Sequence, residues 1–292
     1  MREKIGLIAG WGDFPVAVAQ QLHGRGFDVF CAGYHGHADQ QALRPLCRVY
    51  KPVGMARLGA QARYFRRNGV TRAMMAGKVF KTVIFQRFYW LRHTPDLAFI
   101  RFFYPHFVTK TANRNDDDLL LTAIRLFRSY GVDIVPATDL APELLVKEGN
   151  LTQRRPNDAQ QRDIEFGWQI ARKMGGLDVG QSVAVQGRVV LAVEAIEGTD
   201  ECIRRAGMLC PTGGFTVVKV AKPQQDMRFD VPTIGVGTLK TLKIAGGSVL
   251  AIEADKTIIL DQQAVMEFAN RHKIAVVALN GEAMDASCCA AA

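Results

Sequence analysis

The chain has 292 residues, of which 48% are hydrophobic and 22% are charged, and its formal net charge is +9 at pH 7. This balance allows a sizeable buried core and excludes an intrinsically disordered chain, while the length favours two domains over one. The positive charge favours polyanionic ligands such as nucleic acid, anionic lipid or phosphorylated compounds, but it does not choose among them.

The first half of the chain alternates short apolar runs with amphipathic stretches. Strands are predicted at residues 5–9, 28–33, 71–77 and 132–135, and helices at residues 16–22, 56–68 and 117–130. Such alternation is typical of a parallel sheet covered by helices. We therefore expect an N-terminal Rossmann-like domain over residues 1–146.

The second half begins with a polar segment, 147–163, which glycine, proline and asparagine interrupt and which is predicted to be a linker. Strands are predicted at residues 182–185, 188–194, 215–220, 249–253, 257–260 and 274–279, and helices at residues 163–174, 238–245 and 262–273. The first two strands flank Gln186-Gly187, which predicts a hairpin. We expect a C-terminal catalytic α/β domain with a mixed sheet over residues 164–286 and a frayed tail over 287–292.

Several motifs do not occur in the sequence, and their absence narrows the possible classes of protein. The six cysteines show neither a C-x-x-C motif nor paired Cys/His spacing, so neither a zinc knuckle nor a disulfide framework is indicated. The sequences H-E-x-x-H and G-x-S-x-G do not occur, which argues against a zinc hydrolase and an α/β-hydrolase. The apolar run Ile5–Ala9 is too short for a signal peptide or a membrane span. We therefore expect a cytoplasmic protein.

Gly10 and Gly12 lie where the first predicted strand passes into a helix. Backbone amides and the positive end of the helix dipole at such a turn can hold a phosphate. Because position 15 is proline, the sequence G-W-G-D-F-P is not the G-x-G-x-x-G dinucleotide motif. Phosphate contact and a simple tight turn therefore remain equal alternatives for the two glycines.

Acidic residues concentrate in two places. Asn115–Asp118 precedes a strong helical pattern, and we interpret it mainly as an N-cap with favourable charges beside the helix dipole. Glu194, Glu197 and Asp200 lie at the end of a predicted strand, where two carboxylates can hold a divalent cation through hard oxygen ligands. Thr199 or Asp200 can instead cap the following helix, and both alternatives stay open.

The densest group of polar residues lies further along the second domain. Lys219 and Lys222 can neutralise phosphate, and Asp230 follows them ahead of Pro232. Because Pro232 keeps the preceding residue extended, Asp230 is expected at the end of an extended segment and not inside a helix. Two further residues can offer a hydroxyl and backbone amides to a ligand at the next helix start: Thr233 and Gly235. The alternative is a solvated turn.

The segment 80–110 interleaves many aromatic side chains with lysine and arginine. Amphipathic stretches of this kind can bind an anionic membrane surface with the apolar side down. An ordinary core, a dimer contact and binding of single-stranded nucleic acid are the alternatives.

Four islands of the second half resemble, in matching order, the LpxI family of UDP-diacylglucosamine pyrophosphatases. They are Leu177–Gln181, Glu194–Asp200, Lys219 with Lys222-Pro223, and Asp230–Gly235. The resemblance extends from Gly6–Gly10 to Ile274–Val277 and so covers most of the chain. It implies a Rossmann-like N-terminal domain, a distinct C-terminal domain, and magnesium-dependent release of UMP and lipid X (2,3-diacylglucosamine 1-phosphate) in lipid A biosynthesis.

The resemblance also implies roles for individual residues. In that family a catalytic aspartate stands in a D-x-P-T-I-G motif, which maps onto Asp230. We expect Asp230 to bind the metal or to orient the attacking water, with Glu197 and Asp200 completing a site for Mg²⁺ that Mn²⁺ can also fill. Lys219 and Lys222 are expected at the diphosphate. The other expected substrate contacts are Gly10, Gly12, Thr199, Thr233 and Gly235.

The implied partners are a lipid-linked UDP-sugar substrate and, by peripheral contact, the cytoplasmic face of the inner membrane. Nucleic acid is not expected as a partner, and a homo-oligomer stays open.

Two other function classes remain as alternatives. A nucleotide-dependent oxidoreductase would use the N-terminal sheet. Against this alternative, the sequence lacks the third glycine of the G-x-G-x-x-G motif and an acidic residue at the end of the second predicted strand. A non-catalytic basic protein that binds membrane surface or nucleic acid would account for the charge.

Overall fold

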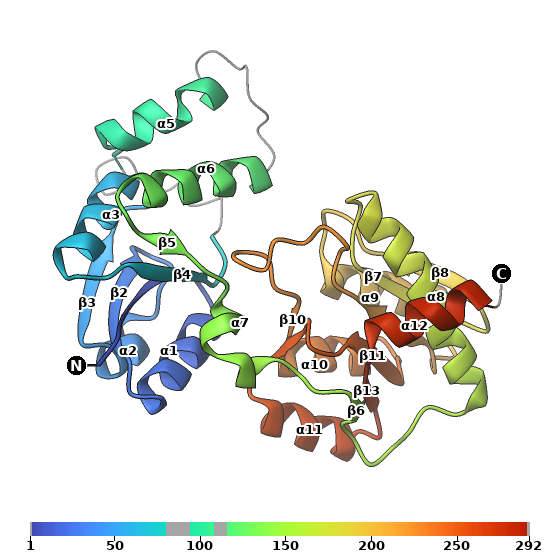
Figure 1. Ribbon diagram of the computed structural model, residues 1–292. Coiled ribbons are helices and arrows are strands. Elements are labelled where there is room, and N and C mark those ends of the chain that lie inside the picture. The colour runs from blue at the N-terminus through green and yellow to red at the C-terminus, as the bar shows by residue number, and fades with distance from the viewer. Residues whose placement is uncertain (1, 80–93, 108–115, 291–292) are drawn as a thin grey trace. The chain divides into compact units, whose positions relative to one another are not determined.

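The computed structural model describes residues 2–79, 94–107 and 116–290, and it divides into two compact units (Figure 1). Unit 1 comprises Met1–Pro142 with Met227–Phe229, and unit 2 comprises Glu143–Asp226 with Asp230–Ala292. Each unit is built around its own sheet, parallel in unit 1 and mixed in unit 2, which confirms the predicted α/β fold class. Within the described ranges, no helix is long and apolar enough to cross a membrane.

Unit 1 contains a five-stranded parallel sheet with the order β3-β2-β1-β4-β5. Its strands are β1 Lys4–Ala9, β2 Asp28–Tyr34, β3 Val49–Val53, β4 Arg72–Ala76 and β5 Asp133–Ile134. The order reverses between β1 and β4, as it does at the switch point of doubly wound sheets. The sequence analysis missed β3 because most of its side chains are not buried and Pro52 lies inside it. Proline is tolerated there because β3 is an edge strand.

Helices cover both faces of this sheet, as a parallel sheet requires. The helical segments are α1 Phe14–Gly24, α2 Gln40–Leu43, η1 Arg44–Leu46, α3 Leu58–Arg67, α5 Leu97–Phe107, α6 Asp116–Ser129, α7 Ala137–Leu140 and η3 Pro142–Leu144. One core cluster joins α3 and α6 to the sheet through Phe65, Leu126 and Phe127, which are fully buried. Helix α1 packs against β1, β2 and β4 with its own buried residues, Val18 and Leu22 among them.

Unit 2 contains a six-stranded sheet with the order β6-β13-β11-β9-β7-β8 and a separate parallel pair, β10 and β12. Its strands are β6 Gly149–Asn150, β7 Ser182–Gln186, β8 Val189–Val193, β9 Thr216–Lys219, β10 Thr233–Ile234, β11 Val249–Glu253, β12 Ile258–Ile259 and β13 Ala275–Leu279. The central strands β9, β11 and β13 are parallel, whereas β6 and β7 run antiparallel to their central neighbours. The sheet is therefore mixed, as predicted.

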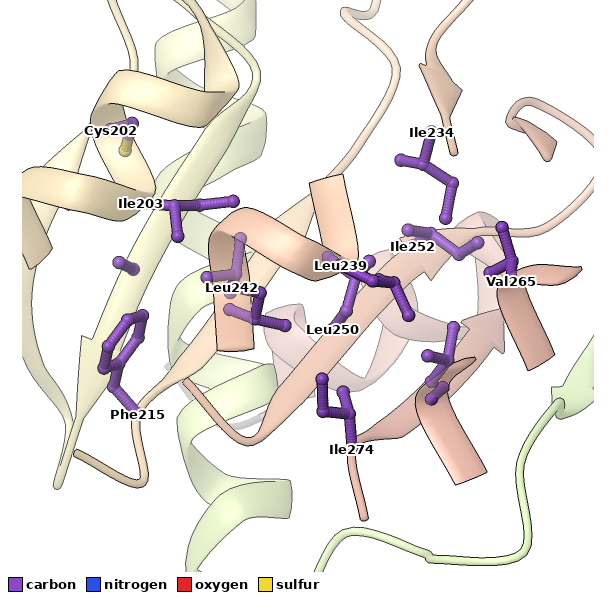
Figure 2. Close-up of a cluster of buried hydrophobic side chains, with 14 of the residues drawn as sticks. Cys202, Ile203, Phe215, Ile234, Leu239, Leu242, Leu250, Ile252, Val265 and Ile274 are labelled. Atoms are coloured by element: carbon purple, nitrogen blue, oxygen red, sulfur yellow. The ribbon is translucent and has the colours of Figure 1, made fainter. Parts of the chain in front are cut away.

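Five helices complete the described part of unit 2: α8 Asp158–Gly176, α9 Thr199–Leu209, α10 Val236–Ile244, α11 Gln262–Arg271 and α12 Gly281–Ala290. A cluster that includes Ile203, Leu242 and Leu250 fills the space between α9, α10, α11 and one face of the sheet (Figure 2). A second cluster, with Ile164 and Trp168, packs α8 against the other face. The sheet is thus buried on both sides.

The segment predicted to be a linker, 147–163, contributes β6 and the first turns of α8 to unit 2. Asn157 and Gln160 form a capping box, in which the Gln160 amide donates to Asn157 Oδ1 at 2.9 Å. With this cap, α8 starts at Asp158, five residues earlier than predicted. The prediction placed the start too late because the residues of a capping box resemble a loop in composition. Helix α12 extends over part of the predicted tail.

Candidate active site

The candidate site lies at one edge of the unit 2 sheet. The parallel strands β9, β11 and β13 all end at this edge, and ligands of open α/β sheets bind beyond such carboxyl ends. Because β7 is antiparallel to both β9 and β8, β7 begins here and β8 ends here. The edge therefore brings together Lys219 from β9, Glu253 from β11, Ser182 from β7 and Glu194, which follows β8.

A buried polar cluster joins Lys219, Thr199, Glu194 and Ser182. Lys219 Nζ donates to Thr199 Oγ1 at 2.7 Å, and Thr199 Oγ1 donates to Glu194 Oε1 at 2.9 Å. Ser182 Oγ lies 3.4 Å from the same threonine hydroxyl. Lys219 is 4% exposed and Glu194 is 7% exposed, so a cation and a carboxylate share a buried environment. The structure thus brings together two predicted substrate contacts, Lys219 and Thr199.

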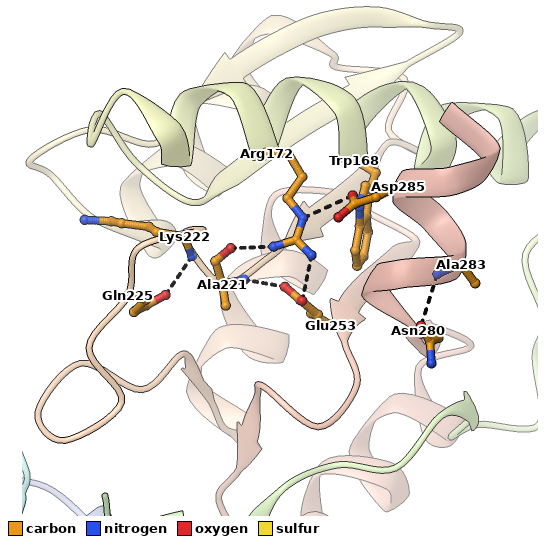
Figure 3. Close-up of polar contacts among 9 residues, drawn as sticks. All are labelled: Trp168, Arg172, Ala221, Lys222, Gln225, Glu253, Asn280, Ala283 and Asp285. Atoms are coloured by element: carbon orange, nitrogen blue, oxygen red, sulfur yellow. Dashed lines mark hydrogen bonds and ion pairs between the residues drawn. The ribbon is translucent and has the colours of Figure 1, made fainter. Parts of the chain in front are cut away.

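The other buried carboxylate of the edge, Glu253, is held by Arg172 of α8 (Figure 3). Arg172 Nη2 donates to Glu253 Oε1 at 2.7 Å and Arg172 Nη1 donates to the Ala221 carbonyl at 2.9 Å. Glu253 Oε2 accepts the Ala221 amide at 2.8 Å. Arg172 and Glu253 thereby fix the chain at the residue before Lys222, and sequence reasoning assigned neither of them a role.

Lys222 lies at the exit of β9, where the end of α8 supports it. Its Nζ donates to Asp178 Oδ1 at 2.6 Å. Figure 3 shows its backbone amide, which donates to Gln225 Oε1 at 2.7 Å. A Cβ on Gly175 would lie only 3.2 Å from Lys222 Cα, so the helix and the loop are in close contact. The backbone at Lys222 is therefore fixed from two sides.

Asp230 lies on the loop that leaves the carboxyl end of β9, ahead of β10. The prediction that it is not in a helix is confirmed, but it follows a turn and not the extended segment that was expected. Its amide donates to the Asp226 carbonyl at 3.0 Å, which closes a turn. Among the described residues of unit 2, no hydrogen bond or ion pair involves its half-buried carboxylate. Thr233 donates to the Val231 carbonyl at 2.9 Å, and Gly235 precedes α10 without a side-chain cap.

The expected metal trio is not assembled. Nowhere in the described ranges do three or more His, Cys, Asp or Glu side chains form a group that could hold a metal, so Asp230, Glu197 and Asp200 do not converge in this structure. Glu197 instead pairs with Arg205 of α9, which also donates to the Val193 carbonyl at 2.6 Å. A hydrogen bond from its own amide, followed by the charge of Arg205, lowers the pKa of Glu197.

The alternative capping role for Thr199 or Asp200 is wrong. The N-cap of α9 is Gly198, whose φ of +86° favours glycine, and no side chain caps this helix end. Thr199 occupies the first helical position and directs its hydroxyl into the buried cluster. The sequence pattern could not separate these roles, because the same Thr-Asp pair is typical of helix starts.

Gly10 and Gly12 belong to unit 1, where β1 leads into α1. A Cβ at Gly10 would lie 2.7 Å from the Lys78 carbonyl oxygen, and Gly12 has a φ of +102°. The chain on either side is fixed by Trp11 and Lys78, whose backbone hydrogen bonds are 2.8 and 2.9 Å long. Both glycines are thus required by the backbone, and their phosphate contact remains a prediction.

The segment 80–110 is described only over residues 94–107. There Phe103 is 5% exposed and stacks on Phe99 with ring centroids 4.3 Å apart, so some of its aromatic residues belong to the core of unit 1. Leu97 is 85% exposed, and Arg101 is exposed as well. The predicted contribution of residues 80–93 and 108–110 to membrane binding lies outside the described residues. Helix α6 starts at Asp116, inside the acidic run in which a carboxylate was predicted as the N-cap, and the position before it is not described.

Comparison with known proteins covers both halves of the chain. Residues 4–144 match the model of the LpxI N-terminal domain, and residues 147–277 match that of the LpxI C-terminal domain. A relative from Caulobacter vibrioides, named UDP-2,3-diacylglucosamine pyrophosphatase LpxI, is 30% identical over 274 residues, which cover 91% of this chain and 94% of the relative. The C-terminal match contains all four sequence islands that resemble the family. This chain belongs to the LpxI family.

Proposed function

We propose that this chain hydrolyses the diphosphate bond of a UDP-2,3-diacylglucosamine and releases UMP and 2,3-diacylglucosamine 1-phosphate for lipid A synthesis. The name of the Caulobacter relative supports the substrate and the reaction class. The observation that carries the proposal is the carboxyl end of β9, where Lys219 is buried, Lys222 is fixed and the loop that carries Asp230 begins. Neither alternative function class gains support from the comparisons.

Lys219 and Lys222 are the residues proposed to bind the diphosphate. Each ammonium is a compact charge with three donors, which suits phosphoryl oxygens. Burial strengthens the attraction of Lys219 for a phosphate because fewer waters screen its charge. Lys222 is paired with Asp178, whose side chain is 58% exposed, and this ion pair can exchange for a substrate phosphate.

Asp230 is proposed either to bind the metal or, as a general base, to orient and deprotonate the attacking water. A general base must be within hydrogen-bond reach of the water, and no described residue of unit 2 bonds the Asp230 carboxylate and competes for this role. The neighbouring Pro232 is buried and keeps the end of the loop in place. The other proposed contacts within unit 2 are Thr233 of β10 and Gly235, the N-cap of α10, and a phosphate contact of Gly10 and Gly12 stays a prediction for unit 1.

The donor set at Asp230 fits Mg²⁺, which commonly binds through one or two carboxylates together with substrate phosphates and several waters. A preassembled group of three protein ligands is therefore not required. Asp230 is the proposed ligand, and Asp200, an exposed residue in the first turn of α9, is a second candidate. The bound ion would neutralise charge that develops on the phosphoryl oxygens. Mn²⁺ prefers similar oxygen ligands.

Substitution of Asp230 tests the proposed mechanism. Asp230→Ala is expected to abolish UMP release while substrate still binds, because only the reacting carboxylate is lost. Turnover should be followed by UMP release, and binding by titration calorimetry in detergent micelles. Asp255→Ala is a matched control, since Asp255 is an exposed aspartate of unit 2 that pairs with Lys147. Wild-type turnover in Asp230→Ala would remove Asp230 from the mechanism.

A cytoplasmic protein in peripheral contact with the inner membrane also follows from the proposed lipid substrate. The net charge of +9 would favour an anionic leaflet, and each basic residue near the surface contributes about 1 kcal/mol. The combined replacement of Arg87, Arg92 and Arg101 by alanine should weaken sedimentation with anionic liposomes but not with neutral ones. Unchanged sedimentation of the triple variant would contradict membrane binding by the segment 80–110 and would favour a role in the core or in a contact between copies of the chain.

A further inference from the structure

The buried cluster at the end of β9 contains an unusual use of a threonine. Thr199 occupies the first helical position of α9, one residue after the N-cap position at which a threonine hydroxyl ordinarily caps a helix. Gly198 takes the N-cap position instead, and no side chain caps this end. The Thr199 hydroxyl is thereby available to Glu194, which follows β8, and to Lys219, the last residue of β9.

The protons of this cluster can be assigned by counting donors. A threonine hydroxyl has one proton and an ionised carboxylate has none, so the 2.9 Å contact requires Thr199 to donate to Glu194. The 2.7 Å contact then requires Lys219 Nζ to donate to Thr199. The carboxylate thus fixes the direction of the hydroxyl, and the hydroxyl fixes the direction of the ammonium.

Stability alone does not favour such a cluster. Buried ion pairs can often be replaced by apolar residues of similar volume without loss of stability. Glu194 Oε2 is buried and has no hydrogen-bond partner among the described residues, and an unsatisfied buried group is unfavourable. Burial and the charge of Glu194 also raise the pKa of the neighbouring Cys202 to about 12, so this thiol stays neutral and adds no charge.

We propose that Thr199 and Glu194 are positioning residues for the Lys219 ammonium, which they hold in the orientation that binds the substrate diphosphate. The inference rests on the proposed role of Lys219. It reassigns Thr199 from direct substrate contact to the support of Lys219, because its only proton is already donated. Neither residue touches the reacting phosphorus, so each acts only through Lys219.

A mutant cycle tests this dependence. Thr199→Val keeps the shape of the side chain and removes the hydroxyl, and it is expected to lower kcat/KM by up to about 100-fold through misplacement of Lys219. Thr199→Ser should restore most of this loss. In a Lys219→Met background, Thr199→Val should have no further effect, because its target is gone. Thr241→Val is the matched control, since Thr241 is buried and, among the described residues, its hydroxyl bonds to the Gly237 carbonyl of its own helix.

Glu194→Gln provides a second variant should Thr199→Val fail to fold, and it too should be non-additive with Lys219→Met. Each melting temperature is measured alongside kcat and KM, because a purely structural role would lower the melting temperature and leave the kinetics of the folded protein unchanged. Wild-type kinetics in Thr199→Val, or additive losses with Lys219→Met, would overturn the inference. Absence of UMP release by the wild-type chain would instead refute the proposed function.

Discussion

Replacement of Arg172 by alanine should destabilise unit 2 strongly. Arg172 lies 2.7 Å from Glu253, and their side chains are 20% and 5% exposed. It also donates to the Ala221 carbonyl, and its guanidinium lies 5.4 Å from the Trp168 ring centroid. Among the residues that the structure describes, the substitution would leave the buried Glu253 charge with one partner, the Ala221 amide.

The expected loss of stability follows from this burial. Removal of one partner of a buried ion pair costs about 3–5 kcal/mol, because the other charge is left without compensation. With a typical urea dependence of about 2 kcal/mol per molar, the unfolding midpoint should fall by roughly 2 M. Lys147→Ala breaks an ion pair whose side chains are 75% and 57% exposed. This control should cost less than about 1 kcal/mol.

Tryptophan fluorescence can follow unit 2 selectively. The chain has three tryptophans, and replacement of Trp11 and Trp90 by phenylalanine leaves Trp168 as the reporter inside unit 2. The midpoint of urea unfolding is the quantity to compare, since the emission of Trp168 itself changes when Arg172 is lost. A midpoint shift no larger than that of Lys147→Ala would refute the reasoning and would mean that water replaces Arg172 at Glu253.

Two further outcomes follow from the packing and the pKa values of single residues. Gly180→Ala should destabilise unit 2 by about 1–3 kcal/mol in urea unfolding, because the new Cβ would lie 2.0 Å from the Glu194 carbonyl oxygen. Gly176→Ala is the control: its Cβ would have no atom within 4 Å, so it should be neutral or stabilising by up to about 1 kcal/mol. At pH 8, Cys202 should resist iodoacetamide in the native protein, because it is buried and its pKa is raised to about 12. Cys47 is partly exposed, and a hydrogen bond from Cys31 lowers its pKa. It should therefore react first once the two adjacent cysteines of α12 are replaced by serine, and mass spectrometry would show the order of reaction.

Sequence patterns predicted the elements whose side chains are buried. Strand β11 occurs at Val249–Glu253 as predicted, since five buried residues form an uninterrupted run. Strand β3 was missed because an edge strand with exposed side chains has no such pattern. The hairpin of β7 and β8 was predicted, but its turn lies one residue later, at Gly187 and Arg188, whose amides donate to the buried Asp163 of α8. A tertiary contact of this kind leaves no local signal.

The same limit applies to the candidate site. Lys219 and Asp230 were predicted as candidate site residues because they lie within a short stretch that resembles the LpxI family. Arg172 and Glu253 are 81 residues apart, and only the packing of α8 on the sheet makes them partners. Glu194 stood in the predicted acidic group, but the turn after β8 directs Glu197 to Arg205 and leaves Glu194 facing Thr199. The choice among three acidic residues depended on three-dimensional structure.

The most direct test of the proposed function is the release of UMP from UDP-2,3-diacylglucosamine by the purified chain. We expect UMP and 2,3-diacylglucosamine 1-phosphate in equal amounts with Mg²⁺, no release in EDTA, and recovery when Mg²⁺ or Mn²⁺ is added in excess. UDP-N-acetylglucosamine, which lacks the acyl chains, serves as the control substrate. Full activity in EDTA would contradict the proposed metal site, and the absence of UMP release with Mg²⁺ would contradict the proposed function.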